Sequence, residues 1–89
     1  MGKRPELPEP IVISRDWLNR RKDALTGSLQ TYKGTNVFDL RKYAMTREGK
    51  LVPTAKGLTI AVTRLRDLEK AVGQAIKRAV ELRLIDEAD

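Results

Sequence analysis

The predicted architecture follows from residues 32–60, which read YKGTNVFDLRKYAMTREGKLVPTAKGLTI. This stretch holds a turn at Lys33-Gly34, an alternating run from Asn36 to Ala44, and a second turn at 47–49. A shorter alternating run follows at 57–60. Alternation of apolar and polar residues has the period of a strand with one dry face. The stretch therefore predicts strands at 36–45 and 57–61, with a bend or an edge position at Pro53.

The two faces of the strand at 36–45 differ in chemistry. Phe38 and Leu40 point to one side. The other side carries the intervening polar and aromatic residues, Asp39, Arg41 and Tyr43. Lys33 and Lys56 lie in neighbouring turns or loops. A sheet face that combines cations with aromatic rings is typical of a single-stranded nucleic-acid interface.

Length and composition limit the class of protein. A chain of 89 residues is expected to form one domain, and a domain of this size is marginally stable alone. The chain has no Cys and no His, so disulfides and the usual zinc sites are excluded. We therefore predict no metal site and no cofactor, and we expect oligomerisation to supply stability.

The charge distribution favours an anionic partner. The net charge is +6, and residues 30–60 alone carry six basic and two acidic side chains. Such an excess on the predicted sheet suits a polyanion, although small domains also carry net charge for solubility. No run of about 18 apolar residues and no signal peptide is visible. We expect no membrane partner and a cytoplasmic location in a bacterial or phage-infected cell, or a nuclear one in a eukaryote.

The segment before the central stretch is interpreted as a tail, a helix and a strand. Residues 1–13 are proline-rich and predict an extended tail in which 11–13 are able to add an edge strand. Ser14 is a potential cap for a short helix over 14–24, in which Trp17 acts as a packing anchor. Residues 25–32 alternate weakly and predict the first main strand.

The segment after the central stretch predicts a long helix from Thr63 to Ile85, with Thr63 as its cap. Two apolar rows follow its length, which makes a stripe too wide for one partner surface. One row is expected to cover the sheet and the other to meet a second chain. The domain is thus predicted to span 14–85, followed by an acidic tail at 86–89.

The sequence contains few of the side chains that enzymatic catalysis requires. No His or Cys is present to make a nucleophile–base pair, and neither Ser14 nor Ser28 lies in a nucleophile-elbow pattern. The glycines at 34 and 57 lack the spacing of a phosphate-binding loop. We therefore predict a binding protein and no catalytic residues.

In its order of motifs the stretch from Leu29 to Val72 resembles the single-stranded DNA-binding domain of the transcriptional coactivator positive cofactor 4 family. The resemblance rests on an ungapped series of motifs: Tyr32-Lys33-Gly34, Phe38-Asp39-Leu40-Arg41-Lys42-Tyr43, Glu48-Gly49, Pro53 and Lys56-Gly57-Leu58-Thr59-Ile60. It implies an α+β fold, with a curved four-stranded antiparallel sheet followed by a long C-terminal helix. It also implies a homodimer formed through the helices, in which two β-ridges hold single strands.

The resemblance implies roles for individual residues. Tyr32 would stack on a base, Lys33 and Lys56 would meet phosphates, and Arg41 would contact the backbone or a base. The nucleic-acid-binding set is Tyr32, Lys33, Gly34, Arg41, Lys42, Tyr43, Arg47, Lys56 and Gly57. The dimer-interface set is Leu68, Val72, Gly73, Ile76, Ala79 and Val80. Animal members carry a stacking tryptophan at the position of Ala44, and the hypothesis is that this chain compensates through Arg47, Lys50, Lys42 or Trp17.

The sequence thus predicts a homodimeric, sequence-tolerant single-stranded DNA-binding protein, a compact bacterial or phage relative acting in transcription, replication or recombination. Its partners would be single-stranded DNA, a second copy of itself, and polymerase or replication proteins. Two alternatives stay open. One is a protein-interaction adaptor of the transcription or replication machinery. The other is a duplex-DNA-binding transcription factor that uses residues 14–24 as a recognition helix.

Overall fold

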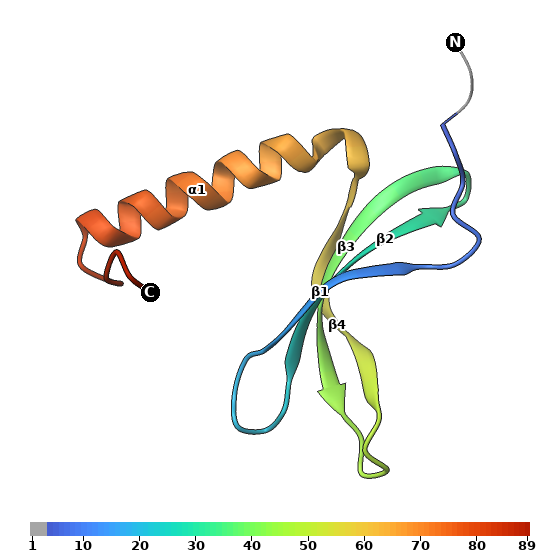
Figure 1. Cartoon of the computed structure of the whole chain (residues 1–89), viewed down its shortest axis with the longest axis horizontal. Coiled ribbons are helices and arrows are strands. Elements are labelled where there is room, and N and C mark those ends of the chain that lie inside the picture. Colours follow the sequence, from blue (N-terminus) through green and yellow to red (C-terminus); the bar gives the residue numbers. More distant parts are fainter. Residues whose placement is uncertain (1–3) are drawn as a thin grey trace.

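Four antiparallel strands and one helix make up the fold (Figure 1). The structure is a computed structural model that describes residues 4–89. The elements, in chain order, are β1 (Ile11–Trp17), β2 (Ala24–Tyr32), β3 (Thr35–Met45), β4 (Leu51–Ala61), a 3₁₀ turn (Val62–Arg64) and α1 (Leu65–Glu81). The sheet order is β1-β2-β3-β4. The predicted four-stranded antiparallel sheet followed by a C-terminal helix is confirmed.

Both predicted turns are confirmed, and glycine explains each. Lys33 and Gly34 have φ values of 51° and 79° between the paired residues Tyr32 and Thr35. Two positive φ values in a two-residue connection are the geometry of a type I′ hairpin. At the other turn Gly49 has φ 85°, and its N–H donates to the Thr46 carbonyl at 3.0 Å.

The helix expected over 14–24 is wrong, because this segment completes β1 and then turns. Arg15 pairs with Thr26, and Trp17 pairs with Ala24, so β1 continues past the expected boundary between residues 13 and 14. Residues 18–23 form a loop in which Lys22 has φ 65°, a conformation that ends helical geometry. The recognition helix required by the duplex-binding alternative is therefore not formed.

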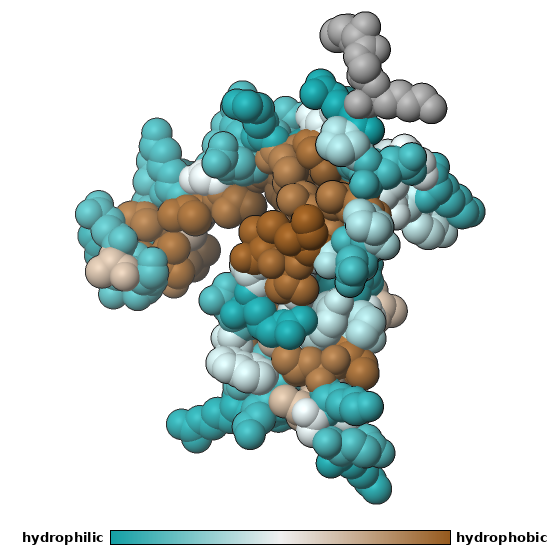
Figure 2. Space-filling view, turned by 45° about the vertical axis from the view of Figure 1, so that its right-hand side comes forward, coloured by the Kyte–Doolittle hydropathy of each residue, from teal (hydrophilic) through white to brown (hydrophobic). Residues whose placement is uncertain are grey.

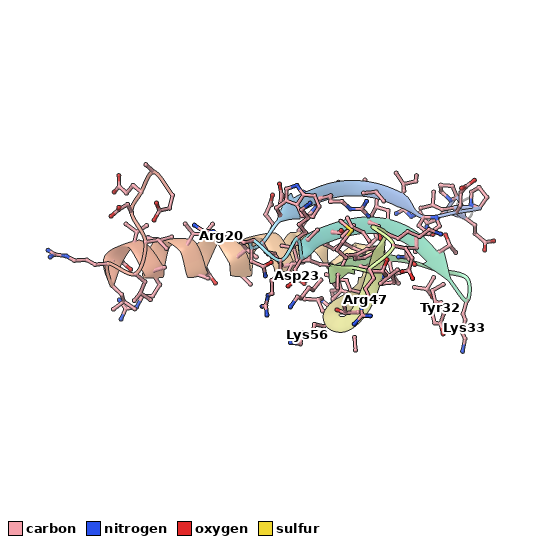
Figure 3. All side chains as sticks on the ribbon, turned by 90° about the horizontal axis from the view of Figure 1, so that it is seen from below. Arg20, Asp23, Tyr32, Lys33, Arg47 and Lys56 are labelled. Atoms are coloured by element: carbon pink, nitrogen blue, oxygen red, sulfur yellow. The ribbon has the colours of Figure 1, made fainter. Side chains whose placement is uncertain are left out.

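Register assigns the side chains of the sheet to two faces. Paired residues lie on the same face. One face is mainly apolar and contains Ile11, Leu25, Leu29, Phe38, Leu40, Leu58 and Ile60, together with the polar residues Asp16, Thr31, Asn36 and Lys42. The opposite face contains Arg15, Trp17, Ala24, Thr26, Ser28, Tyr32, Asp39, Arg41, Tyr43 and Thr59. Figure 3 shows the sheet as an arch with Tyr32, Lys33 and Lys56 beneath it. We call the second set the concave face and the first set the convex face.

The concave face buries small and polar groups, since a hollow surface crowds its own side chains. Thr26, Ser28 and Asp39 are all buried there. Among residues 4–89 the buried apolar residues are Ala24 and Val37, both on this face. The convex face stays partly exposed, so a single chain lacks an ordinary hydrophobic core. Figure 2 shows the resulting apolar areas over the sheet and along the helix.

The helix is shorter than predicted and projects away from the sheet (Figure 1). Thr63 lies in the 3₁₀ turn and does not cap α1, whose first flanking residue is Arg64. The helix ends early because Arg83 takes φ 61°, while the Leu84 N–H donates to the Ala79 carbonyl at 2.8 Å. No residue of α1 is buried, so the expectation that one apolar row covers the chain's own sheet is wrong. Within residues 4–89 no helix has the length and apolar character needed to cross a membrane.

Candidate nucleic-acid interface

The hairpin between β2 and β3 presents an aromatic ring and a cation at one end of the concave face. Tyr32 is 62% exposed, and the Lys33 Nζ lies 5.4 Å from the centre of its ring. The left-handed conformations of Lys33 and Gly34 form the tight turn between these strands. Both side chains point below the arch in Figure 3. The structure therefore brings together Tyr32, Lys33 and Gly34, as the sequence predicted.

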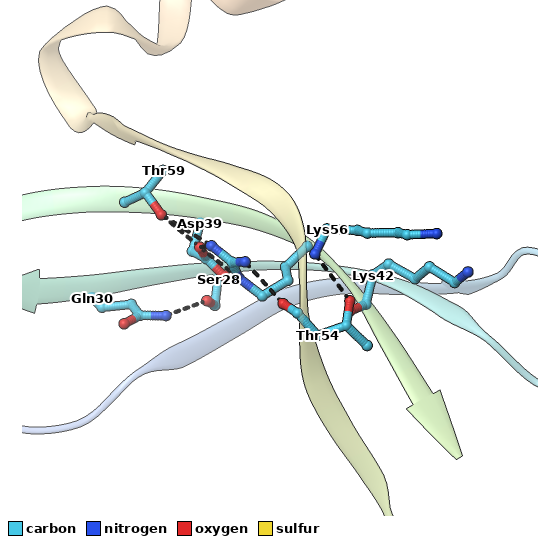
Figure 4. A network of polar contacts seen from close by, with 8 residues as sticks. Ser28, Gln30, Asp39, Lys42, Thr54, Lys56 and Thr59 are labelled. Atoms are coloured by element: carbon cyan, nitrogen blue, oxygen red, sulfur yellow. Dashed lines mark hydrogen bonds and ion pairs between the residues drawn. The ribbon is translucent and has the colours of Figure 1, made fainter.

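A polar network occupies the middle of the concave face (Figure 4). The Arg41 guanidinium donates to the Asp39 carboxylate, with Nη2 2.9 Å from Oδ1 and Nε 3.1 Å from Oδ2. The Thr59 hydroxyl donates to the same carboxylate at 2.8 Å. A third Arg41 bond, from Nη1 to the Thr54 carbonyl at 2.9 Å, ties the network to β4. The network thus holds Arg41 between residues of β3 and β4 and limits its freedom to reach a ligand.

Ionisation is favoured throughout this network. Burial opposes the charged form of Asp39, but the hydrogen bonds from Arg41 and Thr59 and the Arg41 charge outweigh it and hold the Asp39 pKa below 3.8. The hydrogen bond to Asp39 raises the pKa of Arg41 above its ordinary value. The pair is therefore fully charged at neutral pH.

An irregularity in β4 positions Lys56. The register jumps from Arg41 paired with Gly57 to Tyr43 paired with Pro53, so β4 carries extra residues opposite Lys42. The Thr54 hydroxyl donates to the Lys42 carbonyl at 2.7 Å and accepts from the Lys56 N–H at 3.2 Å (Figure 4). Pro53 pairs with Tyr43 directly before this bulge, on an edge strand, and the bulge turns the exposed Lys56 below the arch (Figure 3).

Gly57 is required by the close approach of two strands. A Cβ at this position would lie 2.7 Å from the Leu40 carbonyl oxygen and 2.8 Å from the Arg41 Cα. Glycine at this position is therefore explained by the contact between β4 and β3.

The far end of the concave face holds Arg15, which sequence reasoning missed, and Trp17, which it named as a residue that compensates for the family tryptophan. The Arg15 guanidinium lies 5.2 Å from the centre of the Tyr43 ring, and its Nε donates to the Thr26 hydroxyl at 3.1 Å. Trp17 lies in the same cross-strand row as Tyr43 and is 60% exposed, so it is not the packing anchor that we expected in this chain. The spacing of Arg15 and Trp17 on an alternating strand is the signal that places them together, once 11–17 is recognised as a strand.

Two predicted residues lie elsewhere. Lys42 pairs in register with Leu25 on the convex face, and its Nζ lies 3.3 Å from the Asp23 carboxylate. Arg47 is exposed in the turn between β3 and β4, at the opposite end of the sheet from Tyr32. The structure therefore does not bring Lys42 together with Arg41 and Tyr43.

Replacing Asp39 by Asn is expected to lower the free energy of unfolding by about 1–2 kcal/mol at pH 7, since charge-assisted hydrogen bonds are lost. The folded pKa of Asp39 is depressed, so its contribution exists above the unfolded value of 3.8 and disappears as pH falls through the folded value. The difference between the two proteins should thus be largest at neutral pH and shrink in acid. Chemical denaturation from pH 7 to pH 2 measures it.

The control for this prediction is Asp67→Asn, because Asp67 makes an exposed ion pair with Arg64 at 3.1 Å. An exposed pair contributes little, and an acidic residue in the first turn of a helix adds only a few tenths of a kcal/mol, so this variant should differ from the parent protein much less than Asp39→Asn does. Equal behaviour of the two variants would contradict a stabilising role for the Asp39 network.

Comparison with known proteins yields one family. No curated protein and no solved structure matches the chain significantly. The family model described as Transcriptional Coactivator p15 (PC4) matches residues 24–71, which is more than half of the chain. The match covers β2, β3, β4 and the first turns of α1, and therefore includes the Tyr32 hairpin, the Asp39 network and the Lys56 bulge. The predicted resemblance is confirmed, and the chain belongs to the PC4 family of transcriptional coactivator p15.

Proposed function

We propose that this protein is a homodimer that binds single-stranded DNA with little sequence preference, in transcription, replication or recombination. The observation that carries the proposal is the concave face, where Tyr32, Lys33, Arg41, Tyr43 and Lys56 share one side of the sheet. Exposed rings stack on unpaired bases, and cations neutralise phosphates. None of these contacts depends on the identity of a base, which is why the binding is expected to tolerate sequence.

Roles follow from the contacts of each side chain. Lys33 and Lys56 are exposed and point away from the sheet, so they are suited to phosphates. Tyr32 offers an exposed ring to a base. Arg41 is already bonded to Asp39 and Thr54, so its main role is to hold the floor of the face and the β4 bulge in place. Arg15, which was not predicted, adds a cation beside Tyr43.

Dimerisation is supported by the surface that one chain leaves uncovered. The chain exposes 7766 Å², against about 5300 Å² for a compact monomer of this mass. Its radius of gyration is 15.7 Å, against about 12 Å for a compact domain of this length. The excess surface is the size expected of an obligate interface. A second copy that covers the convex face and α1 would supply the missing core.

The predicted interface residues fit this proposal. All six lie on α1 and none is buried: Leu68, Val72, Gly73, Ile76, Ala79 and Val80. A Cβ built on Gly73 would meet nothing within 4 Å, so the contacts of its own chain do not require glycine there. Mid-helix glycine costs about 1 kcal/mol, and close approach of a partner helix is a reason for it.

Salt titration tests the proposed interface. Contacts of Lys33, Lys56 and Arg15 with phosphates should contribute about −2 to the slope of the logarithm of the association constant against the logarithm of salt concentration. Fluorescence anisotropy of a labelled oligonucleotide of about 20 bases measures it. An unlabelled duplex of the same sequence should displace the labelled oligonucleotide poorly. Salt-independent binding, or preference for the duplex, would reject the proposal.

A further inference from the structure

An uncovered tryptophan ends β1 on the concave face. Trp17 pairs with Ala24, which pairs with Tyr43, so the three residues form one row across β1, β2 and β3. Ala24 is fully buried, so neighbouring side chains cover it, while Trp17 at the edge of the row is 60% exposed. Two strand spacings separate the flanking residues by about 10 Å. The row therefore places two aromatic residues on either side of Ala24, and the ring of Trp17 is the exposed one.

A basic loop follows Trp17 directly. Residues 18–23 contain Arg20, Arg21 and Lys22, and all three side chains are exposed. The loop lies at the same end of the sheet as the turn that carries Arg47 and Lys50 (Figure 1). Both connections are therefore rich in cations at the end of the sheet where Trp17 lies, opposite the Tyr32 hairpin.

The loop is held in a defined shape by Asn19. Its side-chain oxygen accepts from the Arg21 N–H at 3.0 Å and from the Asp23 N–H at 3.2 Å, and its Nδ2 donates to the Asp23 carboxylate at 2.9 Å. The Leu18 N–H donates to the Asp23 carbonyl at 2.8 Å, which closes the loop. This internal bonding turns the backbone polar groups inward and leaves the basic side chains pointing to solvent.

Asp23, the acidic residue of the loop, does not neutralise the basic side chains of the loop. The hydrogen bond from Asn19 is the main cause that lowers the pKa of Asp23, and Lys42 adds to it. Lys42 compensates this carboxylate at 3.3 Å, while Arg21 lies at 4.0 Å. Within the part of the chain that the structure describes, neither Arg20 nor Lys22 makes an ion pair with an acidic group. The nearby Asp16 lies on the convex face.

We propose that Trp17 is a base-stacking residue and that the loop 18–23 binds the phosphates beside that base. This subsite rests on the proposed single-stranded DNA-binding function and extends it across β1, which lies outside the residues matched to the family. Eight residues of β2 separate Tyr32 from the Trp17 row, a distance of about 26 Å along the strand. One strand of DNA would then run the length of the concave face, with a ring at each end.

The fluorescence of Trp17 gives a direct test, since the chain contains a single tryptophan. The full-length protein is titrated with a labelled oligothymidine of about 20 bases, a length suited to such an interface. Anisotropy and tryptophan emission are recorded on the same samples. We expect the emission to be quenched and to saturate together with the anisotropy. Saturating anisotropy with unchanged emission would overturn the Trp17 subsite and leave the proposed function intact, whereas no change in anisotropy would reject the proposed function itself.

Substitutions separate stacking from folding. Trp17→Ala should weaken binding about 5- to 150-fold, the range for loss of one stacked base, while Trp17→Phe should keep most of the affinity because a flat ring remains. Circular dichroism checks that both variants retain the fold. Equal losses for Ala and Phe, or no loss for either, would overturn a stacking role.

The loop is tested by its effect on the salt slope. Neutralising Arg20, Arg21 and Lys22 with glutamine should reduce the slope by about 2 units if all three meet phosphates. The matched control removes the same charge from α1 through Arg66→Gln, Lys70→Gln and Lys77→Gln, and should change the slope much less. Equal slopes for the two triple variants would show that the loop acts only through net charge, which overturns the phosphate contacts. An emission spectrum of Trp17 that shifts with protein concentration but not with DNA would place the ring between copies of the chain and overturn the subsite.

Discussion

Replacing both Lys33 and Lys56 by alanine is expected to weaken binding to single-stranded DNA about 100-fold for every sequence tested. Each lysine is exposed on the concave side of the sheet. At the lower end of the range for charge-assisted hydrogen bonds, each contact contributes about 1.5 kcal/mol, so two contributions amount to about 3 kcal/mol. The salt slope should fall by about 1.4 units in the same variant. Anisotropy titrations at several salt concentrations measure both quantities.

The control must lose the same charge without touching the concave face. Lys70→Ala with Lys77→Ala does so on α1, where both side chains are exposed. This double variant should lose much less affinity, since a distant charge acts only through the screened field of the protein. The mass of the free protein should be the same in all three proteins. Equal losses in the two double variants would mean that net charge alone attracts the strand. Binding to a polymerase or replication protein that survives loss of Lys33, Arg41 and Lys56 would favour the adaptor alternative.

The strands of the central stretch were predictable because their signals are local. Alternation in residues 36–45 and glycine at 34 and 49 are properties of neighbouring residues, and they determine both the strand and its turns. The same alternation assigned Phe38 and Arg41 to opposite faces, which register confirms. Lys42 shows the limit of this reasoning. It was included in the nucleic-acid-binding set together with the rest of its motif, although alternation places its side chain on the convex face.

The helix predicted over residues 14–24 is wrong because the conformation of this segment depends on pairing with residues farther along the chain. Ser14 followed by Asp16 has the composition of a helix start, and Trp17, Leu18 and Arg21 have helical spacing. What decides the conformation is the pairing of β1 with β2, together with the Asn19 bonds that close the loop. The contact between Arg15 and Tyr43 was hidden for the same reason, because it joins two strands whose register no local pattern reveals.

The presence of the C-terminal helix was predicted correctly, but the surface that covers its apolar rows was not. Its two apolar rows were recognised correctly, but periodicity does not distinguish a row that covers the chain's own sheet from one that meets a partner. In the structure neither row is buried. Periodicity reports that a face is apolar, whereas the identity of the covering surface depends on the path of the chain between β4 and α1.

Replacing Ile76 by aspartate is expected to dissociate the proposed dimer and unfold the chain. Ile76 is 52% exposed in the single chain, where an aspartate would cost less than about 1 kcal/mol through helix propensity. Buried between two helices, an unpaired charge costs about 3–5 kcal/mol, and two-fold symmetry places it in the interface twice. Because a single chain buries only Ala24 and Val37 among the apolar residues of 4–89, dissociation should remove most of its stability. Light scattering and thermal unfolding over a range of protein concentrations measure both effects.

Gln74→Asp provides the matched control for this prediction. It introduces the same side chain into α1 at an exposed position on the polar side, two residues before Ile76. The helix-propensity cost is similar at both positions, so any larger effect of Ile76→Asp must come from what covers Ile76. The control should remain dimeric, with a melting temperature that rises with protein concentration as mass action requires. If the two aspartate variants have the same mass and the same melting temperature, Ile76 faces solvent in the assembled protein, and the second copy must cover the chain by another surface or not at all.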